Sequence, residues 1–133
     1  MSKFSLRKVN KDLRPLQEQY SDGELATLSK HGTIIDIAPG QNLMEEGTVG
    51  SEVAVILEGH AKITVNGDVI AEAGVGDVIG EKAVLLSEPR AASVCAATLL
   101  KILVLGVEAF ANVLTDSDEF RRRIDTQVQS QGA

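Results

Sequence analysis

Glycines at short intervals, separated by runs rich in valine and isoleucine, mark the middle of the chain between residues 33 and 105. Short β-branched runs are typical of strands, and glycine supplies the turns between them. The pair Asn66-Gly67 favours a tight hairpin, because both residues tolerate the positive φ angles of that turn. This even spacing predicts a small antiparallel roll or barrel. The glycines are Gly40, Gly47, Gly50, Gly59, Gly67, Gly74, Gly76 and Gly80.

The individual strands follow from the same pattern. Residues 52–57 are nearly all apolar, so this strand is expected to be central, whereas residues 60–65 alternate as a half-buried strand does. The expected fold class is mainly β with flanking helices: an eight-stranded antiparallel β-roll, jelly-roll-like, over residues 33–105. The strands are expected at 33–37, 42–44, 52–57, 60–65, 68–71, 92–96 and 101–105, with one more leading into Gly80.

Before the roll, the sequence predicts an N-terminal arm over residues 1–20 and then a domain over residues 21–133. Ser21 and Glu24 form a capping box, and Gly32 is placed to end the helix that follows. The arm either packs on the roll as a short helix or, being basic and amphipathic, binds a membrane or a partner. Its apolar face consists of Leu6, Val9, Leu13 and Leu16, and Pro15 should end the helix there.

After the roll, two helices are predicted over residues 107–128. The first has apolar residues at helical spacing, namely Val107, Phe110, Ala111 and Leu114. The second should begin near Ser117, because acidic residues follow in its first turn, where the helix dipole favours them. Its apolar stripe consists of Phe120, Ile124 and Val128.

Composition narrows the classes of function. The 133 residues suffice for one domain, and the net charge of −6 argues against a protein that coats nucleic acid. No apolar run approaches the ~20 residues of a membrane helix, and a secretory signal is absent from the first residues. We therefore expect a cytoplasmic protein with no nucleic-acid partner and no membrane span. Cys95 is expected to be inert core, and neither His31 nor His60 has a second ligand at a useful spacing, so no metal site and no catalytic residues are predicted.

The segment from Gly80 to Ala92 carries the most specific chemistry. A short helix should start at Glu81, and Pro89 then restarts an extended chain that holds Arg90. Gly80 lets a ligand approach the backbone, the helix start offers N–H groups, and Arg90 can donate two hydrogen bonds to an anion. Glu81 would repel an anion but can accept a hydrogen bond from a hydroxyl group.

This combination predicts a ligand that carries a hydroxyl group beside a phosphate. Ala83 and Ala91 are small, which leaves the neighbouring N–H groups reachable. Spacing alone leaves a second interpretation open, in which Glu81 and Arg90 form a structural ion pair that ties the helix to the strand.

The segment resembles the phosphate-binding cassette of the cyclic-nucleotide-binding domain family, which includes regulatory subunits of cyclic-AMP-dependent kinase, catabolite activator proteins and gated channels. The family pattern is Gly-Glu-x-Ala-Leu, then Pro-Arg-Ala-Ala-Thr/Ser-Val. Residues 80–84 read Gly-Glu-Lys-Ala-Val, and residues 89–94 read Pro-Arg-Ala-Ala-Ser-Val. The likeness covers roughly residues 20–128, including turns at 39–40, 46–47, 57–59 and 74–77.

The resemblance implies that Glu81 and the Gly80 backbone hold a ribose 2′-hydroxyl, while Arg90 clamps the cyclic phosphate with help from the N–H groups of Ala83 and Ala91. Family members that prefer cyclic GMP often carry Thr at the position of Ala91, so cyclic AMP (cAMP) is expected in preference to cyclic GMP (cGMP). The expected ligand-binding residues are Gly80, Glu81, Ala83, Arg90, Ala91 and Ala92.

The chain departs from the family pattern at two positions. Ile79 stands where the family often has Phe, and it should still fill the core. Lys82 replaces a commonly apolar residue and is expected to face solvent rather than to bind the ligand.

The resemblance also implies that binding moves the C-terminal helices, with Phe120 or Ile124 covering the adenine as a lid. In the alternative, the stripe packs on the roll or on a second protomer, as in a homodimer.

The expected function is a regulatory sensor, not an enzyme, that acts on an effector protein or a fused domain. The other hypothesis is a β-roll that has lost nucleotide binding and serves in protein interaction or dimerisation. No DNA-binding helix pair follows residue 128, so a complete transcription factor is not expected.

Overall fold

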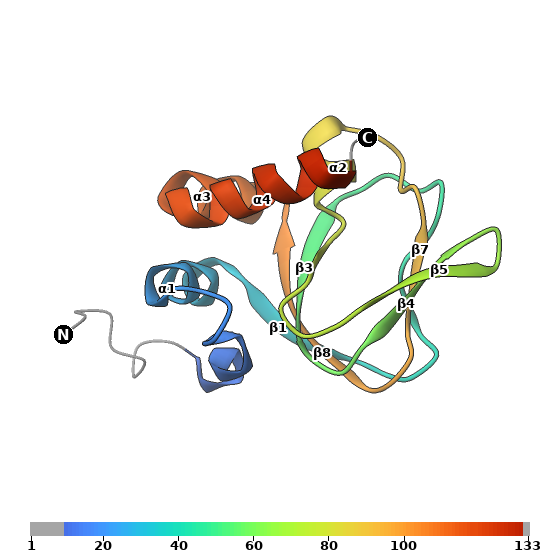
Figure 1. Ribbon diagram of the computed structural model, residues 1–133, viewed down its shortest axis with the longest axis horizontal. Helices are drawn as coiled ribbons and strands as arrows, with labels where there is room; N and C mark the ends of the chain where they lie inside the picture. Colours follow the sequence, from blue (N-terminus) through green and yellow to red (C-terminus); the bar gives the residue numbers. More distant parts are fainter. Residues whose placement is uncertain (1–9, 132–133) are drawn as a thin grey trace.

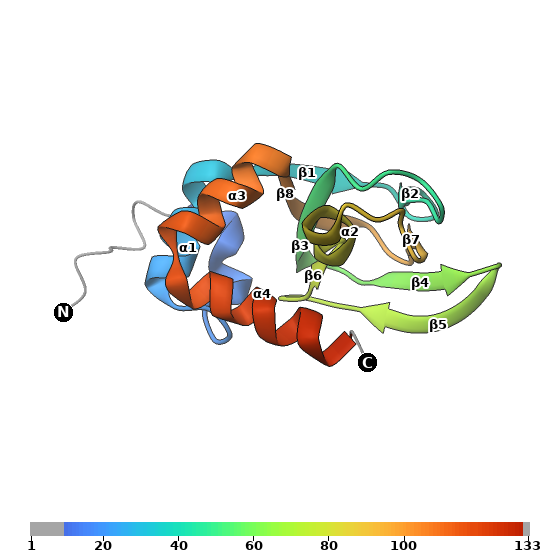
Figure 2. The ribbon, with the colours of Figure 1, turned by 90° about the horizontal axis from the view of Figure 1, so that it is seen from above.

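The computed structural model describes residues 10–131, which form a β-roll at one end and a group of helices at the other (Figures 1 and 2). Eight strands build two four-stranded antiparallel sheets, ordered β1-β8-β3-β6 and β2-β7-β4-β5. The predicted mainly-β, eight-stranded roll with flanking helices is therefore confirmed. The strands are β1 (Thr33–Ile37), β2 (Asn42–Met44), β3 (Glu52–Glu58), β4 (Ala61–Val65), β5 (Asp68–Ala73), β6 (Val78–Ile79), β7 (Ser93–Ala96) and β8 (Leu100–Gly106).

Strand β3 is central because it lies between two apolar cores. Val53, Val55 and Leu57 face the helices, whereas Ala54 and Ile56 face the interior of the roll between the two sheets. All five side chains are buried. A strand covered on both faces needs an unbroken apolar sequence, which explains why residues 52–57 show no polar alternation.

The predicted hairpin and capping box are both confirmed. Asn66 and Gly67 have φ angles of 51° and 85° and connect β4 to β5. At the start of α1 (Asp22–His31), the Ser21 hydroxyl accepts from the Glu24 N–H, and the Glu24 carboxylate accepts from the Ser21 N–H. Gly32 follows the last residue of that helix.

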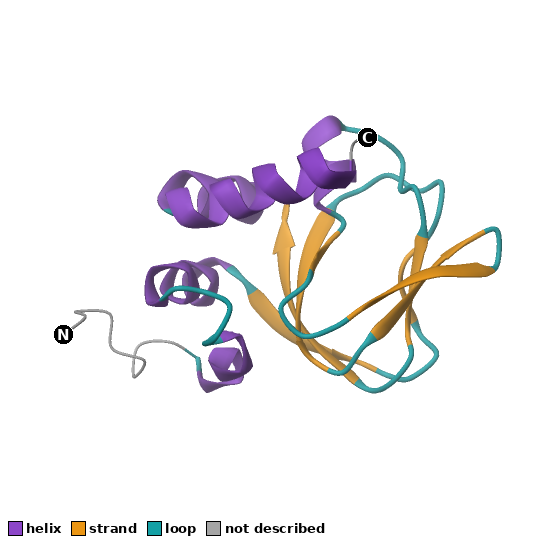
Figure 3. Cartoon of the chain, viewed as in Figure 1, coloured by secondary structure: helices purple, strands orange, loops and turns teal. Residues whose placement is uncertain are grey.

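Four helical segments cover the outer face of the first sheet (Figure 3). They are η2, a 3₁₀ helix (Lys11–Leu16), α1, α3 (Val107–Asp116) and α4 (Asp118–Gln131). Leu13, Leu16 and Tyr20 are buried in the same core as α1, so the described part of the predicted arm packs on the domain. Pro15 lies inside the 3₁₀ helix, which ends one residue later, and Leu6 and Val9 lie outside the described residues. No helix among residues 10–131 is long and apolar enough to cross a membrane.

Helix α4 is fixed to α1 by an ion pair whose acidic partner is buried. The Arg123 guanidinium donates from Nε to Glu24 Oε2 over 2.8 Å and from Nη2 to Glu24 Oε1 over 2.9 Å. Glu24 is 2 % exposed, and the same guanidinium stacks 3.8 Å above the ring of Tyr20. Phe120 and Ile124, one on each side of Arg123 in the sequence, are fully buried in the core beneath.

Replacing Arg123 by methionine should lower the free energy of unfolding by about 2 kcal/mol, because it leaves the Glu24 carboxylate buried without its cation. Urea denaturation followed by circular dichroism measures this change. The double variant Glu24→Gln with Arg123→Met should recover part of the loss, since it removes the uncompensated charge. If the double variant loses as much as both single variants added together, the pair does not interact as described.

Candidate functional site

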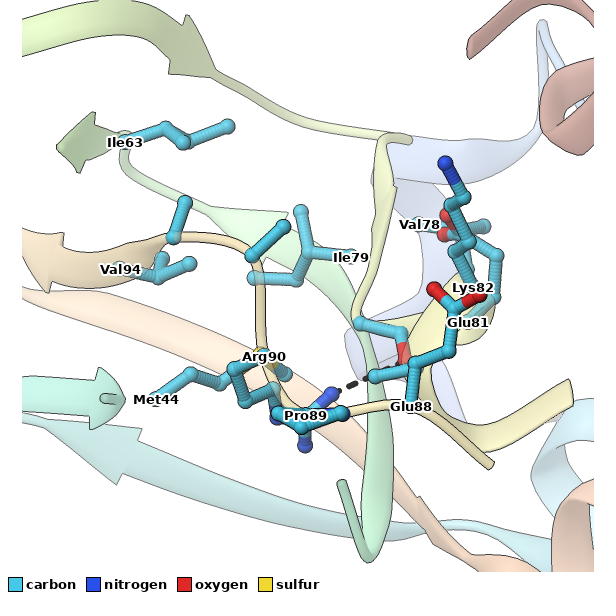
Figure 4. Close-up of a pocket in the computed structure, with 14 residues that line it drawn as sticks. Met44, Ile63, Val78, Ile79, Glu81, Lys82, Glu88, Pro89, Arg90 and Val94 are labelled. Carbon is cyan, nitrogen blue, oxygen red and sulfur yellow. Dashed lines mark hydrogen bonds between the residues drawn. The ribbon is translucent and has the colours of Figure 1, made fainter. Parts of the chain in front are cut away.

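A pocket of about 200 Å³ opens between the short helix α2 (Glu81–Leu86), strand β6 and the second sheet (Figure 4). All six predicted ligand-binding residues lie on its wall. Its volume is below the ~300–1,000 Å³ of sites that enclose a drug-sized ligand, so a nucleotide-sized molecule would be only partly covered. The lining residues are Met44, Ile63, Val78, Ile79, Gly80, Glu81, Lys82, Ala83, Glu88, Pro89, Arg90, Ala91, Ala92 and Val94.

The Arg90 side chain is the main positive charge of the pocket. It is only 7 % exposed, and its guanidinium donates to two backbone carbonyls, from Nη1 to Gly80 O over 2.9 Å and from Nη2 to Glu52 O over 2.7 Å. Among residues 10–131, no carboxylate forms an ion pair with it within 4.0 Å. Burial lowers the pKa of Arg90, and the charges of Glu52 and Glu81 oppose that effect. Buried charges in proteins are normally paired, so this guanidinium provides a site for an anion.

Two glycines make room for the Arg90 side chain. Gly80 has a φ angle of +87°, and a Cβ atom there would come within 2.5 Å of Arg90 Nη1. A Cβ atom on Gly50 would lie 2.7 Å from the Ala83 Cβ and 3.3 Å from the same Arg90 nitrogen. The requirement for glycine at position 80 is therefore both conformational and steric.

Glu81 is the first residue of α2 and is only 3 % exposed. Its Oε2 atom accepts a hydrogen bond of 2.6 Å from the Nε2 amide of Gln127 in α4. Burial raises the pKa of Glu81, while the backbone N–H groups of Glu81 and Lys82, the Gln127 amide and the Arg90 charge lower it in part. Since Glu81 and Arg90 share a pocket without an ion pair within 4.0 Å, the interpretation as a simple structural ion pair is wrong.

The three alanines of the predicted site differ in exposure. Ala83 is 8 % exposed on α2, Ala91 is exposed, and Ala92 is half-buried just before β7.

Helix α2 has only six residues, so its dipole is a minor source of positive potential compared with Arg90. Lys82 is half-buried and lines the pocket, so the expectation that it faces solvent is only partly met.

The apolar wall of the pocket was not predicted from the sequence. Met44, Ile63, Val78 and Val94 come from four different strands, β2, β4, β6 and β7. The alternation of residues 60–65 could have indicated that Ile63 points inward, but nothing local indicated that it meets the others. This wall can receive the apolar part of a ligand whose anionic group lies at Arg90.

The residue of α4 closest to this chemistry is Gln127, which the sequence did not single out. Phe120 and Ile124, predicted as a lid, are fully buried in the core among the helices, and neither lines the pocket. In this conformation the stripe packs on the domain, as in the alternative stated above.

Comparison with known proteins gives consistent results. A family model described as "Cyclic nucleotide-binding domain" matches residues 34–117. A cAMP-dependent protein kinase regulatory subunit from Mycosarcoma maydis is 33% identical over 109 residues, which cover 75% of this chain and 21% of that protein. A cGMP-dependent protein kinase from Toxoplasma gondii is 28% identical over 97 residues, which cover 73% of this chain and 10% of that protein. This chain thus spans only a tenth to a fifth of the length of these two relatives.

A solved structure described as "Sp-2Cl-cAMPS bound to PKAR CBD2" superimposes with a TM-score of 0.71 at 20% sequence identity. The superposition covers 92% of this chain and 88% of that one. At this level of identity the likeness establishes the fold.

Replacing Glu81 by glutamine should raise the free energy of unfolding at pH 7. Because the pKa of Glu81 is raised on folding, the folded protein holds this proton more tightly than the unfolded chain does. Stability from this group is complete below its ordinary pKa of 4.5 and is lost as pH rises through the higher folded value. Urea denaturation at pH 7 and at about pH 4 should therefore show a gain that disappears in acid.

The matched control is Glu88→Gln, since Glu88 lines the same pocket but is exposed. This variant should leave the free energy of unfolding nearly unchanged at both pH values. A gain from Glu81→Gln that is equally large at both pH values would contradict the ionisation of Glu81 as its cause.

Proposed function

Because the chain belongs to the cyclic nucleotide-binding domain family, we propose that its pocket binds cAMP and that it acts as a regulatory module rather than as a catalyst. The observation that carries this proposal is the buried Arg90 guanidinium, which has no ion-pair partner within 4.0 Å among the described residues. A cyclic phosphate supplies the single negative charge that this position lacks, and two of its oxygens can accept parallel hydrogen bonds.

The ribose would lie beside the phosphate, next to Glu81 and Gly80. Glu81 can accept a hydrogen bond from the 2′-hydroxyl, and Gly80, with no side chain, allows the sugar to approach the backbone. Ala83, Ala91 and Ala92 line the pocket with small side chains, so their backbone N–H groups would lie beside the phosphate. The apolar residues Met44, Ile63 and Val94 provide a surface for the base or sugar carbons.

Preference for cAMP over cGMP rests on the side chains around the pocket. Position 91 is alanine, and none of the fourteen described lining residues is a serine or threonine that could donate to guanine. The named relatives include both a cAMP-dependent and a cGMP-dependent kinase protein, so the pocket chemistry is the argument for cAMP.

A regulatory role is supported by the position of the C-terminal helices. Strand β8 continues directly into α3, and α4 extends from there towards α2, which carries Glu81 (Figures 1 and 2). A ligand that repositions α2 would therefore act on α4, and through it on an effector protein or a fused domain. Two conformations that bind the ligand differently are required for this coupling.

Isothermal titration calorimetry with cAMP and cGMP tests the proposal. We expect cAMP to bind with a Kd below ~100 μM and cGMP to bind more weakly. If neither nucleotide binds in that range, the protein is instead a β-roll that serves in protein interaction or dimerisation.

Replacing Arg90 by alanine should weaken cAMP binding by at least about 2 kcal/mol, or roughly 30-fold, because it removes a charge-assisted contact to the phosphate. Arg90→Lys keeps the charge but loses the forked geometry, so it should bind more weakly than the wild type and more tightly than Arg90→Ala. Arg121→Ala is the matched control, since Arg121 is exposed on α4 and lines none of this pocket. Wild-type affinity in a folded Arg90→Ala protein would refute the assignment of the phosphate site.

A further inference from the structure

The side chain of Gln127 joins three elements at the edge of the pocket. Its Nε2 atom donates to Glu81 Oε2 over 2.6 Å and to the Val78 carbonyl over 2.8 Å, so one amide connects α4 to α2 and β6. Both acceptors are oxygens that carry no hydrogen when Glu81 is ionised. The opposite orientation of the amide would place its own oxygen against them, so the donor assignment is fixed by chemistry.

The Glu81 carboxylate already accepts from three donors of the protein itself. The backbone N–H groups of Glu81 and Lys82 and the Gln127 amide all stabilise it, and the side chain is nearly inaccessible to solvent. The two backbone donors belong to the first turn of α2 and cannot leave without unfolding that turn. Of these three donors, only Gln127 can withdraw by a change of side-chain conformation or by movement of its helix.

From this arrangement we propose that Gln127 competes with the 2′-hydroxyl of the nucleotide for Glu81, so that ligand binding detaches the end of α4 from the pocket. The proposal rests on the function proposed above, because it takes Glu81 as the acceptor for the ribose. It assigns Gln127 as a positioning residue that couples occupancy of the pocket to the C-terminal helix.

The contacts along α4 limit the movement to its last turns. Phe120, Arg123 and Ile124 attach the first half of the helix through the core and the ion pair with Glu24. Beyond Ile124, Asp125 and Thr126 are exposed, and Val128 is only half-buried. The Gln127 amide is therefore the main polar attachment of this half to the roll, and its loss leaves the first half in place.

A pair of ligands separates competition from other effects of a substitution at this position. Gln127→Leu removes the donor at similar volume and is compared with the wild type for binding of cAMP and of 2′-deoxy-cAMP, which lacks the competing hydroxyl. We expect the variant to bind cAMP roughly tenfold more tightly or better, since a hydrogen bond to a charged group no longer has to be broken. Binding of 2′-deoxy-cAMP should be unchanged. Gln129→Leu, at an exposed position of the same helix, should alter neither affinity.

The outcomes distinguish this proposal from the proposed function. If the wild type binds neither nucleotide, the proposed function itself fails. If the wild type binds cAMP but Gln127→Leu binds it equally or more weakly, Gln127 does not compete, and the inference is overturned while the function stands. Equal tightening for both ligands also overturns it, because the effect would then not involve the 2′-hydroxyl.

Amide hydrogen exchange gives an independent measurement on the wild type. Saturating cAMP should increase exchange at residues 125–129, while 2′-deoxy-cAMP should leave it unchanged and exchange at residues 118–124 should not rise with either ligand. Protection of residues 125–129 by cAMP would show that the ligand tightens this attachment, contrary to the proposal.

Discussion

The hydrogen bonds of the Arg90 guanidinium to the carbonyls of Gly80 and Glu52 hold the site together. They connect the segment after α2 to the residue before α2 and to the first residue of the central strand β3. Strand β3 is itself packed between two apolar cores, so the cation is attached to a strand that is covered on both faces. Because carbonyls rather than carboxylates hold it, the guanidinium is positioned without being neutralised, and its charge remains available to an anion.

Glu81, the buried acidic group of the pocket, lowers the stability of the fold when it is ionised. Glu81 is buried as a carboxylate, which raises its pKa and makes its ionised form costly to the fold. Hydrogen bonds from α2 and from Gln127 offset part of this cost. In the proposed function, this costly carboxylate serves as the acceptor for a ligand hydroxyl beside the anion site at Arg90.

Much of the fold could be predicted from the sequence because its signals are local. The Asn66-Gly67 turn, the capping box at Ser21 and the apolar run of β3 each depend on neighbouring residues, and each is confirmed. The segment from Gly80 to Ala92 likewise brings its own pocket residues together, because it is continuous in sequence. Ile63 and Gln127 could not be found in this way, because their roles arise from contacts between distant segments.

The stripe of α4 shows the limit of such patterns in more detail. Apolar residues at helical spacing predict which face of a helix is buried, but not what covers it. Phe120 and Ile124 are buried in the core that α4 shares with α1, α3, η2 and the outer face of the first sheet, so the residue that reaches the pocket is a polar one beyond them. This division gives α4 two attachments of different kinds: an apolar and ionic one outside the pocket, and a hydrogen bond to Glu81, the carboxylate that we propose for the ribose. In the mechanism that we propose, a signal from the pocket would therefore act on the second half of α4 without any change in the core that holds the first.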